Sequence, residues 1–497
     1  MNVTSIRHTL RVLGAACILS FTASACAQPV QPFLSPLFTD NMVLQRGMRD
    51  PVWGWTTPGA TVTVEVAGKR ATAVADASGK WMARIGPFSA GGPFTLNVKG
   101  PEQRTLHNVM VGDVWLCSGQ SNMQMGIANV NNAAEEIAHA DYPSIRLFTV
   151  PMEVAYAPRS TVSGAWQVCT PQTISQDGWG GFSAVAYFFG RALHQTLKVP
   201  IGLIHSSWGG TIAEAWTSAE ALQKLPDFAQ RLEQVERIRA AGEASLPANQ
   251  RRNPNVCTVL YNAMIAPLIP FGMKGVIWYQ GESNAGRAYQ YRTLLPALIQ
   301  DWRTRWNEGP FPFLIVQLAN FLPVKPQPGE DEWAELREAQ LLTAEHVPNC
   351  GLAVTIDIGD AADIHPKNKQ EVGRRLALAA LAIAYKRHLE YSGPIYKSYK
   401  REDSAIRLFF THVDGGLVAH GDTLQGFAIA GSDRKFVWAD ARIEGDTVVV
   451  SSQAVPDPVA VRYGWAINPV VNLYNREGLP ASPFRTDDWP GLTYNRK

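Results

Sequence analysis

The sequence predicts an α/β protein with a mostly parallel central sheet and β-rich regions at both ends. Between residues 108 and 392, short apolar runs alternate with longer stretches of helical periodicity. Such alternation is typical of a parallel sheet covered by helices on both faces. On either side of that region, strand-like segments are instead separated by glycine and proline turn signals, which favours accessory β domains.

The first β-rich region is expected to be an N-terminal sandwich domain over residues 28–107. Its clearest strand is Ala60–Val66, which alternates in polarity and is rich in β-branched side chains. Turn signals stand on both sides of it, at Thr57–Gly59 and Ala67–Lys69. The pattern changes after residue 107, where the central domain begins.

The central domain, residues 108–392, supplies the strands and helices of the expected parallel sheet. Its apolar runs predict buried strands at Val111–Leu116, Val199–Ile204, Gly275–Tyr279, Phe313–Leu318 and Leu352–Ile356. Helical spacing predicts helices at Ala184–Leu197, Arg292–Trp306 and Lys369–Tyr385, and a surface helical excursion at Ala219–Ala241.

Residues 393–497 are expected to form a second β-rich region. The sequence predicts strands at Ala405–Phe410 and Thr447–Ser451, and Gly-Asp and Gly-Gly turn signals lie between them.

Composition excludes some classes of function. Hydrophobic residues make up 46% of the chain and the net charge is only +2, which argues for a globular protein and against a nucleic-acid footprint. Cys117, Cys169, Cys257 and Cys350 are spaced neither like a disulfide scaffold nor like a zinc site.

The first 27 residues resemble a signal peptide. Arg7 and Arg11 precede an apolar run over residues 12–25 that is too short to span a membrane, and residues 25–27 fit a small-residue cleavage site. We therefore expect a periplasmic or secreted protein. Lipoprotein anchoring through Cys26 is less favoured, because Ala23 replaces the large apolar residue expected three positions earlier.

The most informative motif is the turn Cys117-Ser-Gly-Gln-Ser-Asn-Met-Gln124, which directly follows a predicted strand. A serine at such a turn presents its hydroxyl at a helix N-terminus, where developing negative charge is favoured. Ser121 is therefore the candidate nucleophile. Met123 replaces the second glycine of the G-x-S-x-G elbow, which argues against an ordinary α/β-hydrolase.

A serine nucleophile needs a base, normally a histidine oriented by a carboxylate. His365 is the best candidate, because it lies in a polar loop after a predicted strand, where open α/β sheets place ligands. The candidate orienting carboxylates are Asp357, Asp360 and Asp363. His205, at the end of another strand, is the competing base.

Two further polar loops follow predicted strands. In the first, Gln280 and Asn284 are neutral donors suited to an oxyanion, and Glu282 is an alternative carboxylate. In the second, Gly209 and Gly210 allow backbone N–H groups to approach a ligand closely.

At these residues the chain resembles the SGNH hydrolases, and more narrowly the sialate O-acetylesterase-like family. The matching segments are spread over nearly the whole mature chain: Asp40–Gln45, Trp115–Met123, Ser206–Thr211, Trp278–Asn284, Asp363–Pro366, Val461–Trp465 and Gly478–Phe484. The resemblance implies a three-layer α/β/α hydrolase domain with accessory sandwich or jelly-roll-like domains. It implies removal of acetyl groups from carbohydrates without a metal or other cofactor.

The resemblance also implies roles for individual residues. Ser121 would be the nucleophile, His365 the base and Asp363 the third triad member, although only Ile364 separates Asp363 from His365, where the superfamily usually has two residues. Asp360 therefore remains an alternative third member of the triad. The oxyanion donors would be the N–H of Ser121, that of Gly209 or Gly210, and Gln280, with Gln120, Asn122, Glu282 and Asn284 as substrate-binding candidates.

Two other functions compete with the esterase. A glycoside hydrolase would use paired carboxylates, such as Glu282 with an aspartate near His365, and would release sugars instead of acetate. A non-catalytic carbohydrate-binding protein would not need Ser121. For the esterase, acetylated sialic acids and acetylated hemicelluloses such as xylan or xyloglucan are equally compatible substrates.

Overall fold

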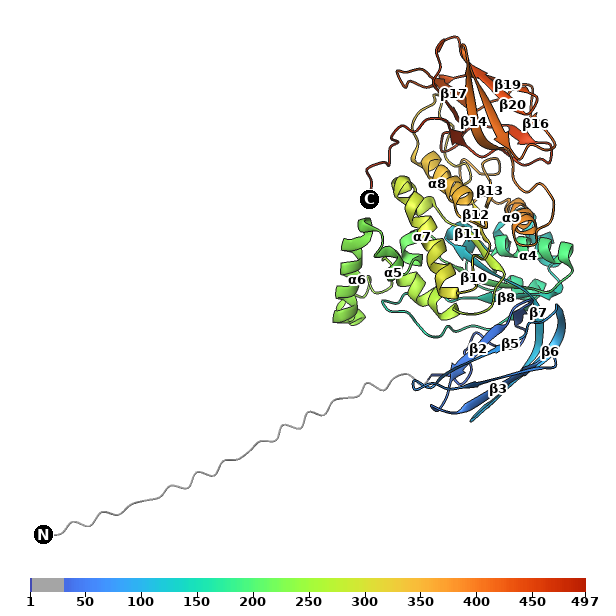
Figure 1. The fold of residues 1–497 in the computed structure, drawn as a ribbon, viewed down its shortest axis with the longest axis vertical. Helices are drawn as coiled ribbons and strands as arrows, with labels where there is room; N and C mark the ends of the chain where they lie inside the picture. Colours follow the sequence, from blue (N-terminus) through green and yellow to red (C-terminus); the bar gives the residue numbers. More distant parts are fainter. Residues whose placement is uncertain (2–30) are drawn as a thin grey trace.

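The computed structural model describes residue 1 and residues 31–497; the predicted signal peptide therefore lies outside the described residues, apart from Met1. Figure 1 shows three regions stacked along the long axis, with the blue N-terminal β region at the bottom and the orange-red C-terminal β region at the top. The α/β region lies between them, as the sequence predicts.

The central sheet runs in the order β13-β12-β11-β7-β10-β8-β9, and every neighbouring pair is parallel except β8 with β9. The predicted parallel sheet is confirmed, with β8 and β9 added to the five expected strands. The strands are β7 (Gln103–Gly119), β8 (Tyr142–Thr149), β9 (Gln167–Cys169), β10 (Ile201–Ser207), β11 (Gly275–Tyr279), β12 (Phe313–Val316) and β13 (Cys350–Ala353).

Helices cover both faces of this sheet. On one side α4 (Ala184–Leu197) packs against α9 (Lys369–Ile383), and on the other α7 (Ala288–Trp306) packs against α8 (Glu332–His346) (Figure 1). Side-chain caps fix where three of them begin, because Ser183, Asp331 and Asn368 accept hydrogen bonds from the first-turn N–H groups of α4, α8 and α9. The remaining short helices here are α1 (Ser121–Gln124), α2 (Ala133–Ala138) and α3 (Pro171–Ile174).

The predicted helical excursion at 219–241 is two helices, α5 (Ala219–Leu222) and α6 (Ala229–Ala241). Pro226 interrupts it, because a residue before proline disfavours the helical conformation, and Leu225 is extended there.

The N-terminal β region shares a strand with the central sheet. The first half of β7 pairs antiparallel with β6 and the strand continues without a break into the central sheet, so β7 crosses the boundary expected after residue 107. Trp53 and Trp81 are completely buried between the layers of this region. Its other strands are β1 (Val43–Gln45), β2 (Asp50–Trp55), β3 (Thr61–Val66), β4 (Lys69–Val74), β5 (Lys80–Ile85) and β6 (Gly91–Lys99).

The C-terminal β region has its own hydrophobic core, which includes Leu408, Phe427 and Val450. One antiparallel sheet has the order β14-β15-β20-β19, a second has the order β18-β17-β21-β23, and β16 pairs with β22. The strands are β14 (Ile395–Glu402), β15 (Ala405–Thr411), β16 (Leu417–Ala419), β17 (Phe427–Ala430), β18 (Val437–Trp438), β19 (Asp440–Glu444), β20 (Thr447–Ser451), β21 (Ala460–Tyr463), β22 (Leu473–Asn475) and β23 (Phe484–Arg485).

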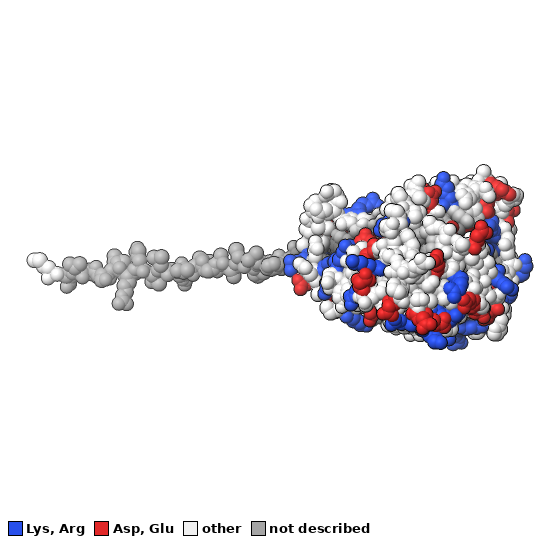
Figure 2. Space-filling model, turned by 90° about the horizontal axis from the view of Figure 1, so that it is seen from above, with Lys and Arg blue, Asp and Glu red and all other residues white. Residues whose placement is uncertain are grey.

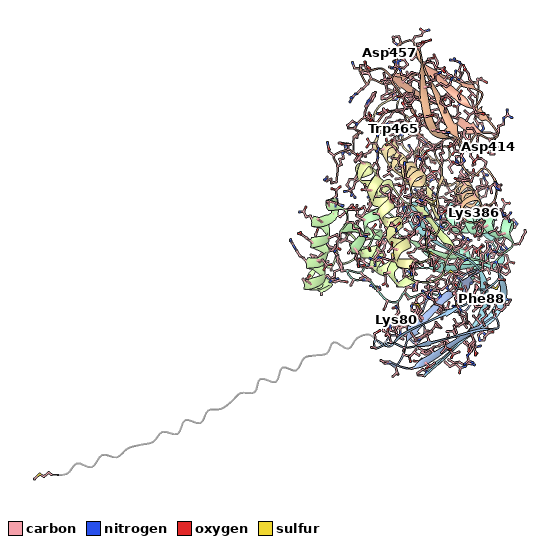
Figure 3. All side chains as sticks on the ribbon, viewed as in Figure 1. Lys80, Phe88, Lys386, Asp414, Asp457 and Trp465 are labelled. Atoms are coloured by element: carbon pink, nitrogen blue, oxygen red, sulfur yellow. The ribbon has the colours of Figure 1, made fainter. Side chains whose placement is uncertain are left out.

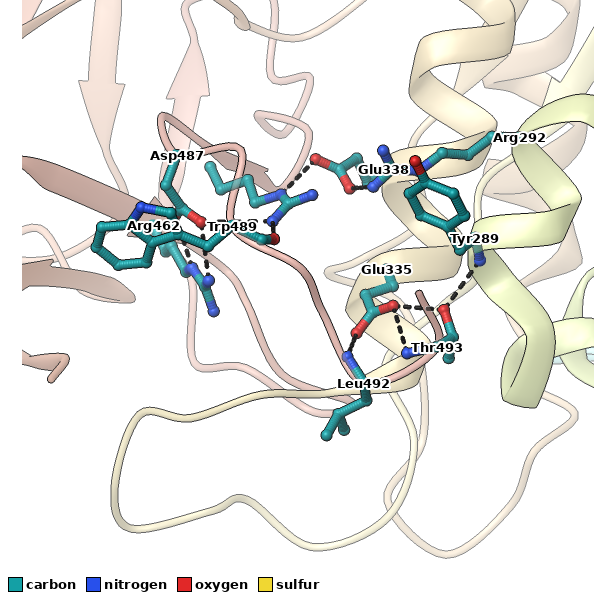
Figure 4. Close-up of polar contacts among 10 residues, drawn as sticks. Tyr289, Arg292, Glu335, Glu338, Arg462, Asp487, Trp489, Leu492 and Thr493 are labelled. Atoms are coloured by element: carbon teal, nitrogen blue, oxygen red, sulfur yellow. Dashed lines mark hydrogen bonds and ion pairs between the residues drawn. The ribbon is translucent and has the colours of Figure 1, made fainter. Parts of the chain in front are cut away.

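After β23 the chain returns to the helices of the central domain and fastens the C-terminal region to them. Figure 4 shows the contacts. The buried carboxylate of Glu335, on α8, accepts hydrogen bonds from the backbone N–H groups of Leu492 and Thr493. The Thr493 hydroxyl in turn accepts from the N–H of Tyr289 on α7 at 2.9 Å. These residues, 486–497, are called the tail below.

The charged surface is mixed. On the face that Figure 2 shows, Lys and Arg side chains are interspersed with Asp and Glu, in agreement with the balanced net charge. Of the helices that the structure describes, none combines the length and apolarity needed to cross a membrane.

Candidate active site

The candidate site lies at the carboxyl ends of three adjacent strands. Gly119, the last residue of β7, is in register with Ser207 of β10 on one side and Tyr279 of β11 on the other. The loops that follow these strands therefore start at the same edge of the sheet. A Cβ on Gly119 would lie 2.1 Å from the carbonyl oxygen of Tyr279, so only glycine allows the strands to come this close.

Ser121 begins α1 directly after this close approach. It is partly exposed, as a nucleophile requires. The helix is only four residues long, so its dipole contributes less than the sequence led us to expect. No described residue accepts a hydrogen bond from the N–H of Ser121.

Gly209 lies against Ser121, whereas Gly210 faces open space. A Cβ on Gly209 would be 3.1 Å from Cβ of Ser121, and one on Gly210 would have nothing within 4 Å. The N–H of Gly209 donates to Oε1 of Gln124 at 2.7 Å. Of the two glycines, Gly209 is therefore the one that packs against the nucleophile.

His365 and Asp363 form a close pair in the loop after β13. Nδ1 of His365 is 3.4 Å from Oδ1 of Asp363, and the same oxygen accepts the backbone N–H of His365 at 2.9 Å. The ring of Trp179 packs edge-on against the imidazole, with centroids 4.8 Å apart. Burial lowers the pKa of His365; Asp363 raises it in part, and Lys369 lowers it further. A lowered pKa keeps the imidazole neutral and able to accept a proton.

The other two aspartates of this loop have different partners. Both carboxylate oxygens of Asp357 bind Arg375, at 2.6 and 2.8 Å. Oδ1 of Asp360 accepts the N–H of Ala362, which makes a local turn. Among the three, only Asp363 faces the His365 ring.

His205, the competing base, is buried within the sheet. Its Nε2 lies at hydrogen-bond distance from the Ser207 hydroxyl, and Phe182 packs on its ring. Burial lowers the pKa of His205 to about 4. Its partner is thus Ser207 and not Ser121.

Asn122 joins the Ser121 turn to the His365 loop. Its Nδ2 donates to Oε1 of Glu282 at 2.6 Å and to the backbone oxygen of Ile364 at 3.0 Å. Its Oδ1 accepts from Nζ of Lys369 at 2.6 Å. The residue after Ser121 therefore holds the residue before His365, although no hydrogen bond joins Ser121 and His365 directly within the part of the chain that the structure describes.

The other predicted polar residues also bond protein groups. Oε1 of Gln120 accepts the N–H groups of Gly281 and Ser283. The amide hydrogens of Gln280 bond the oxygens of Thr211 and Asn284, at 3.1 and 2.7 Å.

All four of these amide side chains are buried in the ligand-free protein. Gln120, Asn122, Gln280 and Asn284 are each at most 3% exposed. In the ligand-free protein the polar atoms of Gln120, Asn122 and Asn284 bond the walls of the site, and their substrate-binding role stays a prediction. An oxyanion role for Gln280 would require one of its two hydrogen bonds to break.

Sequence reasoning missed Lys369, Trp179 and Gln124. Lys369 stands at the start of a predicted helix, and nothing in the sequence distinguishes it from a surface lysine. Trp179 lies in the loop Gln176–Gly181, whose glycines indicate only a turn. The described residues contain no group of three or more His, Cys, Asp or Glu side chains placed to hold a metal ion, and all four described cysteines are buried and unpaired.

Comparison with known proteins identifies the family of this chain. A model of the family described as carbohydrate esterase, sialic acid-specific acetylesterase matches residues 111–382. Mouse sialate O-acetylesterase is 36% identical over 90% of this chain and 93% of its own, and the human protein is 34% identical over 92% and 93%. The crystal structure of a carbohydrate acetylesterase from Xanthomonas citri is 42% identical and superposes with a TM-score of 0.82, over 92% of this chain and 99% of that one. This chain therefore belongs to the sialic acid-specific acetylesterase family of carbohydrate esterases, as the sequence resemblance predicted.

Proposed function

We propose that this carbohydrate O-acetylesterase transfers the acetyl group of a sugar ester to Ser121, with His365 as the base and Asp363 as the carboxylate that orients it. The observation that supports this most is the pairing of His365 with Asp363 at 3.4 Å, in a loop that Asn122 holds to the Ser121 turn. Family membership favours this over the glycoside hydrolase and the non-catalytic binding protein.

The reaction has two steps. His365 takes the hydroxyl proton of Ser121 while Oγ adds to the acetyl carbonyl carbon, and the tetrahedral intermediate then expels the sugar oxygen, which receives that proton from His365. In the second step His365 takes a proton from water, whose oxygen adds to the acetyl-serine. Acetate leaves, and Ser121 recovers its proton from His365.

The negative oxygen of each intermediate needs donors that are already in place. The N–H of Ser121 has no acceptor among the described residues, and Gly209, which packs against Ser121, could supply a second N–H. In the ligand-free protein the side-chain oxygen of Gln124 accepts the Gly209 N–H. We infer that the acetyl oxygen displaces the Gln124 oxygen when the substrate binds.

The Trp179 side chain is placed to contact the sugar ring of the substrate. Its side chain is 41% exposed and contacts His365, so a sugar esterified at Ser121 would lie near it. Its backbone is in the left-handed region, at φ 53°, where a bulky residue is strained. Asn129 and Gly126 hold it there by donating to its carbonyl oxygen. A strained aromatic residue beside the base favours a functional role over a packing role.

The substrate class comprises acetylated sialic acids, which the names of the mammalian relatives support, and acetylated hemicelluloses such as xylan or xyloglucan. The amino-terminal pattern Arg7, Arg11 and residues 12–27 supports export to the periplasm or the medium.

The test is acetate release by Ser121→Ala from acetylated sugars and from 4-nitrophenyl acetate. We expect turnover to vanish while the thermal midpoint stays near that of the wild type, since Ser121 is partly exposed. Mass spectrometry of the quenched wild-type enzyme should find an acetyl group on the peptide that contains Ser121. Acetate release by the variant at the wild-type rate would refute the assignment.

A further inference from the structure

A second pocket lies where the C-terminal β region meets the central domain. It has a volume of about 410 Å³, and the loop 324–327 forms one wall of it. Phe427, Trp438 and Val470 also line it. None of its lining residues belongs to the Ser121 and His365 site, so the proposed reaction leaves this pocket unexplained.

Trp438 presents an accessible aromatic surface to this pocket. The residue ends β18 and is 44% exposed. Its indole N–H donates to the backbone oxygen of Pro326 at 2.9 Å, which fixes the plane of the ring. A fixed indole with an open surface is suited to the apolar face of a pyranose ring, at little cost in conformational entropy.

A buried hydrogen-bond donor lies behind Trp438. A small cavity of about 10 Å³ shares Trp438 with the main pocket and is also lined by Trp465. Trp465 is 6% exposed, and its Nε1 has no hydrogen-bond partner among the described residues. Figure 3 shows Trp465 at the base of the C-terminal region, on the side of the central domain. A buried N–H without an acceptor is unfavourable, and a cavity of this size has room for one hydroxyl-sized group.

The charges around the pocket favour a neutral ligand. Lys325 pairs with Asp331 at 2.7 Å. Arg462, which lines the small cavity, pairs with Asp487 and Glu330 at 2.9 and 2.8 Å. Each cation that lines the described pocket or its small cavity is therefore neutralised already, and a sugar carboxylate would find no free counter-charge.

The wall of the pocket is connected to the loop that carries His365. Oδ1 of Asn320 accepts the N–H of Gly359 at 2.7 Å, and its Nδ2 donates to Oδ1 of Asn468 at 2.8 Å. Phe321 pairs with Asp360 in an isolated β-bridge. Asn320 thus links the pocket residue Asn468 to the loop that carries His365.

We propose that this pocket binds a neutral pyranose unit of the same glycan whose acetyl group reacts at Ser121. The substrate is then a neutral oligosaccharide or polysaccharide chain in preference to a single acetylated sialic acid. This inference rests on the proposed function, because it assumes that the reacting ester is on a sugar.

The experiment compares the wild type with Trp438→Ala and Trp465→Phe, with Tyr399→Ala as the control. Tyr399 is an aromatic residue of the same region, 41% exposed, on β14 and away from the pocket. The substrates are 4-nitrophenyl acetate, acetylated xylose, acetylated xylohexaose and 9-O-acetylated sialic acid. The quantities are kcat and KM for acetate release.

In the wild type we expect kcat/KM to rise from acetylated xylose to acetylated xylohexaose. Trp438→Ala should raise KM for the hexaose about 3- to 10-fold and leave 4-nitrophenyl acetate unchanged. Trp465→Phe keeps the ring and removes the N–H, so it should raise the same KM by about 2- to 5-fold. Tyr399→Ala should change neither the KM for the hexaose nor the activity on 4-nitrophenyl acetate.

Several results would overturn the inference while leaving the proposed function intact. They are a wild type that acts on sialic acid but not on the hexaose, the absence of any length dependence, and an unchanged hexaose KM in Trp438→Ala. A loss of activity in Trp438→Ala that is as large on 4-nitrophenyl acetate as on the hexaose would also overturn the inference, since 4-nitrophenyl acetate carries no sugar. Failure of the wild type on every acetylated sugar would instead refute the proposed function.

Discussion

Nζ of Lys369 donates a hydrogen bond of 2.6 Å to Oδ1 of Asn122, although the lysine has no solvent-exposed surface. Burial lowers the pKa of Lys369 to about 7, and Glu282 and Asp363 raise it in part. Because Oδ1 of Asn122 is held by an N–H donor, its Nδ2 must face Glu282 and Ile364. One buried lysine therefore sets the orientation of the amide that joins the nucleophile turn to the base loop.

Lys369→Met should move the acidic limb of the pH profile of kcat/KM to higher pH. The lysine lowers the pKa of His365, so its removal raises that pKa. Since His365 must be neutral to accept the Ser121 proton, more of the enzyme is then inactive at low pH. We also expect kcat to fall about 10-fold from the loss of orientation.

The control for this profile is Lys367→Met, which removes an exposed lysine two residues away. Both variants are assayed on 4-nitrophenyl acetate across the neutral pH range. A limb that stays in place or moves to lower pH in Lys369→Met would show that the lysine has only a structural role.

Asp363→Asn should lower kcat by about 10²- to 10⁴-fold, because a triad carboxylate holds the imidazole in its reactive tautomer and stabilises its protonated form. Asp360→Asn is the matched control from the same loop. Its carboxylate caps a turn at Ala362 and should change kcat by no more than about twofold. Equal losses of kcat in the two variants would contradict the assignment of Asp363 as the third triad member.

Gly209→Ala should lower kcat about 10- to 100-fold, whereas Gly210→Ala should leave kcat near the wild-type value. A methyl group at 209 would stand 3.1 Å from Cβ of Ser121 and 3.2 Å from Oε1 of Gln124, where the acetyl group must lie. A methyl group at 210 meets no atom within 4 Å, but φ there is +73°, so the expected cost is about 1 kcal/mol of stability. Both kcat and the thermal midpoint are measured. A larger loss of kcat at 210 would assign the oxyanion donor to Gly210.

Trp179→Ala should raise KM for acetylated sugars about 3- to 10-fold and affect 4-nitrophenyl acetate much less, if the indole stacks on the sugar. Trp179→Phe keeps an aromatic face and should recover part of the loss. If both substrates lose activity equally, Trp179 acts through His365, which its ring contacts, and not through the sugar.

Local pattern was sufficient to predict much of the fold. The strand Gly275–Tyr279 and the helix Ala184–Leu197 have the predicted bounds, because a short apolar run and a capped amphipathic stretch each specify their own structure. Ser121, Gly209 and His365 could be nominated because the loops after parallel strands meet at one edge. Pro226 could have been recognised as the break in the helical excursion, because its effect is equally local.

Burial of polar residues could not be predicted in the same way. Asn122 bonds Ile364 and Lys369, which are more than 200 positions away in the chain. Whether an amide faces a ligand or the interior depends on such distant partners, and a sequence pattern of a few residues carries no information about them. The partners of these residues within the protein therefore come from the structure alone, and their substrate-binding role stays a prediction.

Glu335→Ala should release the tail from the central domain. It would leave the N–H groups of Leu492 and Thr493 and the Thr493 hydroxyl without their charged acceptor, at an expected cost of about 2 kcal/mol in local stability. Hydrogen exchange of the Leu492 and Thr493 amides should accelerate about 30-fold. Glu332→Ala is the control, because its ion pair with Arg496 is about half exposed and should contribute less than about 1 kcal/mol. Since the tail lies outside the Ser121 site, kcat on 4-nitrophenyl acetate should stay unchanged in both variants. If the two amides exchange equally fast in Glu335→Ala and Glu332→Ala, the buried carboxylate is not what holds the tail.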